Sequence, residues 1–320
     1  TAHQRGGEEG CTHACCLRAL CWGPMIAAGG HAAAAQETAP CFGTLYDGRQ
    51  PLASLIKRMN ISPSEKMIAR QDGAIGWIIF NQPERHNAVS LAMWEALEVI
   101  VDHFENNPEV RIVVVRGAGE KAFVSGANIS EFETQRNSAE SVANYNLCVA
   151  QAQDAIANCR VPVIAAISGI CYGGGLGLAL SCDLRYCAPN AKFRMPAARL
   201  GLGYGYDGMR SILKSLSPIA AAEAFYTAKV YDATQAVHMG IVNAQHDDVF
   251  AHAADVATQI AANAPLTIHA AKQAMLSIAN GRDNDSTRID QLVDACFKSN
   301  DYAEGRLAFA QKRAPQFTGN

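Results

Sequence analysis

Three consecutive glycines, Gly173-Gly174-Gly175, constrain the fold of this chain more than any other feature. They follow an apolar run typical of a buried strand, Val163–Ile167, and precede an apolar run typical of a helix. A backbone without Cβ atoms allows a ligand to approach closely, and the start of a helix presents N–H groups that have no partner within the helix. Such N–H groups stabilise a developing oxyanion. The stretch therefore predicts a strand-to-helix junction that holds an anion.

A second glycine turn has the same character. The segment Val124–Asn128 contains Gly126 and follows the apolar strand-like run Arg111–Val115. Two strand-to-loop junctions that both offer backbone N–H groups predict one site, which stabilises an enolate or a similar anion.

Composition indicates which partners the chain can have. The 320 residues are 49% hydrophobic and 18% charged, with a formal net charge of −3, which is typical of a soluble globular protein with a sizeable core. This balance gives no electrostatic reason to expect nucleic acid or an anionic membrane as a partner. No apolar run is long enough to span a membrane.

The eleven cysteines form two groups. Six lie in apolar or helical contexts, where a reduced cysteine packs as a small hydrophobic residue, so we expect a reducing compartment and no disulfide framework. We expect the cytoplasm, and a mitochondrial or other organellar location remains an alternative. The other five lie near the N-terminus with a spacing that matches no standard zinc pattern, so we expect no metal site. Those five are Cys11, Cys15, Cys16, Cys21 and Cys41.

The chain divides into three predicted regions. Residues 1–58 are rich in Gly, Ala and Cys without sustained periodicity, which predicts a poorly ordered extension, although residues 18–35 loosely resemble a targeting peptide. Residues 59–260 are predicted to form an α/β core, and residues 261–320 a helical C-terminal region. In the core, strands are expected near 74–81, 111–116, 163–167, 183–187 and 240–243. Helices are expected between them, near 90–106, near 138–159 and after the triple glycine. Ser90 is expected to cap the helix at 90–106.

Four motifs in order resemble the crotonase superfamily, the enoyl-CoA hydratase/isomerase family. They are Asn81–Ala88, Ala122–Ile129, Gly169–Asp183 and Glu304–Arg313, and the resemblance covers roughly residues 67–317. It implies an α/β fold, a crotonase-like spiral of β-β-α units with a helical C-terminal trimerisation region. It also implies assembly as a homotrimer or a dimer of trimers.

The same resemblance implies the ligand and its contacts. Family members bind acyl-CoA thioesters, with coenzyme A as part of the substrate and no separate cofactor. They hold the thioester oxygen between two backbone N–H groups, which correspond here to Ala127 and Gly174. Lys312 corresponds to a position that reaches the nucleotide, often from a neighbouring subunit, although a solvated helix charge is the alternative. The implied CoA contacts as a group are Arg85, Ala88, Ser125, Phe309 and Lys312.

Two positions depart from the hydratase pattern. Hydratases of this family use two glutamates to activate one water, because hydration needs proton removal from water and proton delivery to the α-carbon. Gly177 and Ala197 stand at those positions here. Isomerase, decarboxylase or C–C lyase chemistry is therefore expected in place of plain hydration. An acyl-CoA thioester hydrolase and a non-catalytic CoA-binding protein are the alternatives.

Candidates for acid–base chemistry lie in a polar loop after Pro196. Asp207 is either a general base or the N-cap of a helix that starts near Gly208. Tyr204 and Tyr206 are either hydrogen-bond or proton donors or packing side chains, since an ordinary phenol is a weak acid at neutral pH. Asp183, at the end of the apolar helix, is expected to be a buried structural acid.

Overall fold

The computed structural model describes residues 62–128 and 138–320. The predicted boundary at residues 58/59, the extension before it and its five cysteines lie outside the described residues. In the described part, the α/β architecture and the spiral of β-β-α units are confirmed.

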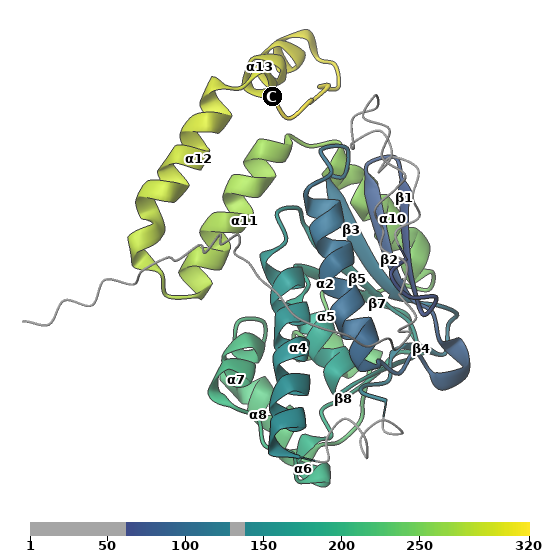
Figure 1. Ribbon diagram of the computed structural model, residues 1–320. Coiled ribbons are helices and arrows are strands. Elements are labelled where there is room, and N and C mark those ends of the chain that lie inside the picture. Colours follow the sequence, from purple (N-terminus) through teal and green to yellow (C-terminus); the bar gives the residue numbers. More distant parts are fainter. Residues whose placement is uncertain (1–61, 129–137) are drawn as a thin grey trace, which may run out of the picture. The chain divides into compact units, whose positions relative to one another are not determined.

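Two sheets carry the strands (Figure 1). The larger sheet has six strands in the order β1-β2-β3-β5-β7-β10, and all its pairings are parallel except that between β1 and β2. Its strands are β1 (Met67–Asp72), β2 (Ile75–Phe80), β3 (Ile112–Gly117), β5 (Val163–Ile167), β7 (Leu184–Cys187) and β10 (Ala244–Gln245). The smaller sheet has the order β4-β6-β8-β9, with only the last pairing antiparallel. Its strands are β4 (Ala122–Val124), β6 (Ile170–Tyr172), β8 (Lys192–Arg194) and β9 (Tyr231–Asp232).

Three times the chain passes from the larger sheet to the smaller one before it enters a helix. This gives three successive turns, β3-β4-α4, β5-β6-α5 and β7-β8-α6, which are the predicted β-β-α units. The helices of the core are α2 (Leu91–Glu105), α4 (Ala139–Asn158), α5 (Gly174–Ser181), α6 (Ala197–Leu200), α7 (Tyr206–Leu213), α8 (Pro218–Thr227), α9 (Ala233–His238) and α10 (Val249–Ala261), with a 3₁₀ turn, η1, at Pro83–Arg85.

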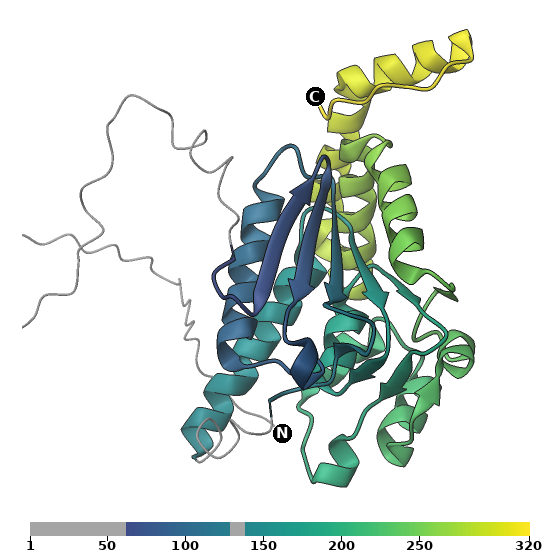
Figure 2. The same ribbon diagram turned by 90° about the vertical axis from the view of Figure 1, so that its right-hand side faces the viewer.

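The period of two along each strand decides which core a side chain enters. Val113 and Val115 of β3 pack into the core under α2, α4 and α5, whereas Ile112 and Val114 pack with α10 on the opposite face. Every residue of β5 is buried, as expected for a parallel strand covered on both faces. Figures 1 and 2 show the helices on both sides of the larger sheet.

The C-terminal region is helical, as predicted. It contains α11 (Pro265–Ala279), the 3₁₀ turn η3 (Asp283–Asp285), α12 (Ser286–Lys298) and α13 (Asn300–Gln311). Helix α12 packs on α11 but buries none of its residues, and both Val293 and Phe297 are exposed (Figure 1). In the described chain, this region therefore leaves apolar side chains in contact with solvent.

Several expectations from the sequence need correction. Strands β1, β4, β6, β8 and β9 were not predicted, and the strand expected at 240–243 is a turn followed by β10. Ser90 is the N-cap residue of α2, but its buried hydroxyl makes no capping hydrogen bond.

Asp183 is structural, but the prediction that it is buried is wrong. Its side chain is 29% exposed and pairs with Lys272, which is 4% exposed, through an Nζ–Oδ2 distance of 2.8 Å. The same oxygen accepts a hydrogen bond of 2.7 Å from the Val163 N–H, and the Lys272 ammonium also donates to the Val161 carbonyl. The ion pair thus ties α11 to the start of β5.

Candidate active site

The two glycine junctions lie at the ends of neighbouring strands. Strands β4 and β6 pair in parallel, with Ala122 opposite Ile170 and Val124 opposite Cys171. Strand β4 leads into the turn that contains Ala127, and β6 leads through Gly173 into α5. Because parallel strands end at the same edge of a sheet, both junctions lie side by side there.

The first junction is shaped by Gly126. Its φ is +115°, and a Cβ atom there would lie 3.3 Å from the Tyr172 carbonyl oxygen, so only glycine fits without strain. Hydrogen bonds of 2.9 Å join the Val89 N–H to the Gly126 carbonyl and the Asn128 N–H to the Val89 carbonyl. Among the described residues, the Ala127 N–H between them has no acceptor. It remains available for a ligand.

The second junction is the start of α5. The Gly173 N–H donates to the Arg194 carbonyl at 2.9 Å, whereas the Gly174 N–H has no acceptor in residues 62–128 and 138–320. A Cβ atom on Gly175 would lie 2.2 Å from the Val124 carbonyl oxygen, so close packing of α5 on β4 requires this glycine. The helix start therefore presents an unused N–H beside the Ala127 turn.

A buried aromatic side chain supports the Gly174 backbone. A Cβ atom on Gly174 would lie 3.3 Å from Cζ2 of Trp94, which is 1% exposed. The Trp94 indole N–H donates to the Tyr145 hydroxyl at 3.2 Å, which connects α2 to α4 behind the junction. Trp94 and Tyr145 were not singled out in the sequence, since a core aromatic residue carries no local signal of this role.

The loop that was predicted to contact CoA lies against the first junction. The Ser125 N–H donates to the His86 carbonyl at 3.1 Å, which places Arg85 and Ala88 next to the turn with Ala127. Arg85 ends η1 and is exposed, so its guanidinium faces solvent. The structure thus brings Arg85, Ala88, Ser125 and Ala127 together.

Asn87 holds this loop in place and was missed in the sequence. Its side chain is fully buried, and its amide nitrogen donates to the carbonyls of Ala122 at 2.7 Å and Ala118 at 3.2 Å. Its amide oxygen accepts from the Gln82 N–H at 2.9 Å. Its positive φ of 53° is a conformation that asparagine tolerates better than most residues.

The two positions that lack glutamate flank the second junction. Gly177 is half-buried on α5, and Ala197 is the buried first residue of α6. The Pro196 ring lies 3.7 Å from where a Cβ atom on Gly173 would be, which places the start of α6 against the triple glycine. Neither residue has an ionisable group, so neither can transfer a proton.

The polar loop after α6 contradicts one of the two interpretations of Asp207, the N-cap. Helix α7 begins at Tyr206 with Gly205 as its N-cap, so Asp207 lies inside the first turn and the N-cap interpretation is wrong. Helix α7 packs against α5, and the Asp207 carboxylate is exposed without a hydrogen-bond partner in the described chain. Tyr204 packs edge-on against Phe225 with ring centroids 4.9 Å apart, and Tyr206 is 80% exposed.

The two remaining predicted contacts lie on α13. Phe309 is 87% exposed, and Lys312 is the exposed C-cap residue with φ +54°. Figure 1 shows α13 next to α12, away from β4 and η1. Within one chain, the structure therefore does not bring Phe309 and Lys312 to the glycine junctions.

Cysteine thiols near the junctions are not nucleophiles. Cys171 on β6 is fully buried, and burial raises its thiol pKa well above the ordinary value. Burial also raises the pKa of Cys182 to about 12 and that of Cys159 to about 11. These side chains stay protonated at neutral pH and pack as apolar groups.

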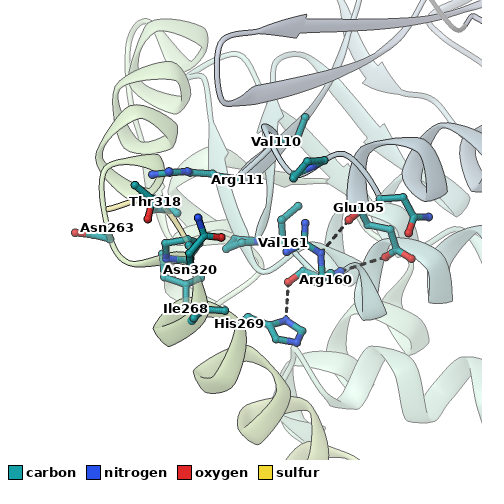
Figure 3. A pocket seen from close by; sticks show the side chains of 17 residues that line it. Glu105, Val110, Arg111, Arg160, Val161, Asn263, Ile268, His269, Thr318 and Asn320 are labelled. Carbon is teal, nitrogen blue, oxygen red and sulfur yellow. Dashed lines mark hydrogen bonds between the residues drawn. The ribbon is translucent and has the colours of Figure 1, made fainter. Parts of the chain in front are cut away.

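A separate cavity of about 440 Å³ lies where β3 and β5 begin (Figure 3). Arg111, Arg160 and His269 line it, and the Arg160 carbonyl lies 3.1 Å from Nδ1 of His269. None of the predicted site residues lines this cavity. The glycine junctions instead follow strands of the smaller sheet.

Two further properties of the described residues concern membranes and metals. Among the helices that the structure describes, none has the length and apolar character to span a membrane. The described residues contain no group of three or more His, Cys, Asp and Glu side chains arranged to bind a metal ion.

Comparisons with known proteins agree with this architecture. The family described as enoyl-CoA hydratase/isomerase matches residues 70–320. The short-chain-enoyl-CoA hydratase of Clostridium acetobutylicum is 30% identical over 253 residues, which cover 77% of this chain and 95% of the relative. The carnitinyl-CoA dehydratase of Proteus mirabilis is 31% identical over 255 residues, with coverage of 77% and 96%.

Solved structures show the same likeness. An enoyl-CoA hydratase/carnithine racemase from Magnetospirillum magneticum superposes with a TM-score of 0.77 at 35% identity, covering 80% of this chain and 97% of that one. The enoyl-CoA hydratase of Bacillus anthracis gives a TM-score of 0.74 at 28% identity, with coverage of 80% and 100%. This chain therefore belongs to the enoyl-CoA hydratase/isomerase family, the crotonase superfamily of acyl-CoA enzymes.

Proposed function

We propose that this acyl-CoA enzyme stabilises a thioester enolate between the backbone N–H groups of Ala127 and Gly174. The observation that carries the proposal is that these two N–H groups have no acceptor among the described residues and lie at neighbouring strand ends. Removing one donor from an oxyanion hole typically costs about 2.7–4 kcal/mol of transition-state stabilisation. With two such donors, enolate formation is proposed as the step that the candidate reactions have in common.

The reaction that follows enolate formation is one that needs at most one carboxylate. Gly177 and Ala197 supply no acid or base, whereas hydration requires both proton removal from water and proton delivery to carbon. Proton transfer between the α- and γ-carbons, decarboxylation or C–C cleavage can each proceed through the enolate. The hydratases and the dehydratase among the relatives are named for adding or removing water, so this chain is proposed to differ from them in its final step.

Asp207 is the proposed general base, with Tyr204 and Tyr206 as proposed hydrogen-bond donors. The exposed carboxylate lies on the first turn of α7, and α7 packs against the helix that carries Gly174. A bound acyl-CoA would have to extend along α5 for Asp207 to reach its α-carbon.

Coenzyme A is proposed to bind across a subunit boundary. Arg85, Ala88 and Ser125 lie beside the Ala127 turn, while Phe309 and Lys312 lie on α13. A neighbouring copy that contributes α13 would bring both sets to one ligand. The exposed Phe297, Leu307 and Phe309 favour such a homotrimer or dimer of trimers, because an assembly would remove their apolar surfaces from water.

The test is exchange of the substrate α-protons with solvent. The full chain is incubated in D₂O with saturated, 3-enoyl and α-carboxy acyl-CoA thioesters, and deuterium at the α-carbon and new products are followed by NMR. Exchange or conversion of at least one thioester, lost in Asp207→Asn, supports the proposal. Release of free CoA without α-exchange indicates a thioester hydrolase, and binding without exchange or turnover indicates a non-catalytic protein; both contradict it.

A further inference from the structure

Gln153 occupies the space beside Gly177 where a hydratase side chain would project. A Cβ atom on Gly177 would lie 2.7 Å from Nε2 of Gln153, which reaches across from α4 to α5. The Gln153 side chain is half-buried and has no hydrogen-bond partner among the residues that the structure describes. A polar amide at this position therefore has unused hydrogen-bonding capacity.

The geometry of α5 relates this amide to the proposed thioester site. Gly177 lies three residues beyond Gly174, which is about 4.5 Å along the helix axis and nearly one full turn. Side chains on a helix tilt towards its N-terminus, so a group above Gly177 faces back towards the Gly174 N–H. The Gln153 amide is thus within reach of the acyl chain at the carbons nearest to the thioester.

The Gln153 amide lies nearest to one position of the ligand, the β-carbon of the acyl chain. If the thioester oxygen binds the Gly174 N–H, the β-carbon lies two C–C bonds of about 1.5 Å each from the carbonyl carbon. A substituent on the β-carbon extends one further bond, towards Gly177 and the amide. The amide offers two N–H donors and one oxygen acceptor, which suit a hydroxyl or a ketone oxygen. It cannot act as a base at neutral pH.

We propose that Gln153 determines specificity for acyl-CoA thioesters that carry oxygen on the β-carbon, either a hydroxyl or a ketone. The inference rests on the proposed function, because it takes Gly174 as the thioester contact. A site that hydrogen-bonds a substrate oxygen discriminates against an analogue without it, since the analogue leaves the half-buried Gln153 amide without that bond. Gln153 would therefore hydrogen-bond the oxygen on the β-carbon of the acyl group, in the place of the two missing glutamates.

The test compares matched thioesters with the full chain by isothermal titration calorimetry. Butyryl-CoA, 3-hydroxybutyryl-CoA and 3-oxobutyryl-CoA are titrated separately, and each ligand is checked for turnover by chromatography. We expect one or both oxygenated thioesters to bind about 5- to 10-fold more tightly than butyryl-CoA, the ratio expected for about 1 kcal/mol. The two oxygenated ligands show whether a hydroxyl or a ketone is preferred.

Gln153→Leu should abolish the preference for the oxygenated thioesters and change the affinity for butyryl-CoA by no more than about twofold. The control variant Gln151→Leu, on an exposed position of α4, should retain the preference. Gln153→Met replaces the leucine variant if that protein does not fold. Equal affinity for all three ligands in the unmodified chain, or a preference that survives Gln153→Leu, overturns the role of Gln153 alone. Failure of every thioester to bind overturns the proposed function as well, and so the two failures are distinguishable.

Discussion

At the scale of single residues, the site depends on backbone atoms more than on side chains. Ala127 and Gly174 contribute N–H groups, while Gly126 and Gly175 allow the close contacts that position them. Such a site can be predicted from the sequence, because few residues other than glycine adopt these backbone conformations. Asn87 and Gln153 cannot be predicted in the same way, because their roles depend on contacts with residues far away in the sequence.

Replacing Gly174 by proline should reduce turnover of the best substrate about 10²- to 10³-fold, since proline lacks the N–H that the oxyanion needs. Proline is tolerated at the first position of a helix, so α5 should persist. Gly174→Ala is the matched control: its Cβ meets Trp94 at the same 3.3 Å, but the N–H remains. Steady-state kinetics of both variants would contradict the oxyanion assignment if proline and alanine were equally active.

Introducing glutamate at both positions tests whether Gln153 obstructs the glutamate at position 177. Gly177→Glu with Ala197→Glu should give little hydration of crotonyl-CoA, because Gln153 Nε2 lies 2.7 Å from the new Cβ and the two side chains compete for the same space. A displacement of about 1 Å is sufficient to cost about 100-fold in rate. Adding Gln153→Ala should raise the hydration rate, whereas adding Gln151→Ala should not. Equal rates in the double and triple variants would show that Gln153 does not obstruct the site.

At the scale of elements, sequence and structure agree best where periodicity is long. The predicted bounds of α2 and α4 agree with the observed ones within one or two residues, and those of β5 agree fully, because each element has a sustained apolar pattern. The strands of the smaller sheet have two or three residues each, which is too short for a pattern to stand out. The cap of α7 was misplaced because Asp207 and Gly205 are both acceptable N-cap residues, and only the backbone distinguishes them.

The C-terminal tail after α13 is held by an ion pair with a clear pH dependence. Oε2 of Glu304 lies 2.8 Å from NH2 of Arg313, and the Gln316 N–H donates to Oε1 at 2.9 Å. Arg313, followed by the Gln316 N–H, lowers the pKa of Glu304 from 4.5 to about 2. Because the folded pKa is depressed, the contribution is complete above the unfolded pKa near 4.5 and is lost as the pH falls towards 2.

We therefore expect Glu304→Gln to reduce hydrogen-exchange protection of the Gln316 amide at pH 7. The difference from the unmodified chain should shrink below pH 4.5 and vanish near pH 2. Glu98→Gln, on an exposed position of α2, is the control and should change nothing in the tail. An equal difference at both pH values would contradict the assigned ion pair.

At the scale of the whole molecule, the core of the described residues begins at Met67. The buried apolar clusters begin with Met67, and the family match begins at residue 70. Relatives are matched over 95% or more of their own length by about four-fifths of this chain, so the fold has a complete counterpart without the first residues. The sequence predicted this architecture, but a single sequence could not show which apolar side chains the folded chain leaves exposed.

A chain that starts at Met59 should fold with unchanged thermal stability, oligomerise and bind CoA like the full chain. The reason is that every described core residue is retained. Differential scanning calorimetry, light scattering and CoA titration measure these three properties in parallel. Loss of soluble protein, or a lower melting temperature after this truncation, would show that residues 1–58 contribute to stability.

The central claim concerns the final chemical step, and hydration of crotonyl-CoA by the unmodified chain tests it most directly. Each missing acid–base contribution is worth about 10²- to 10⁴-fold, so hydration followed by absorbance should be at least about 10²-fold slower than in a family member with both glutamates. A rate comparable with that relative would contradict the account. It would show that Asp207, a tyrosine or another group activates the water despite Gly177 and Ala197.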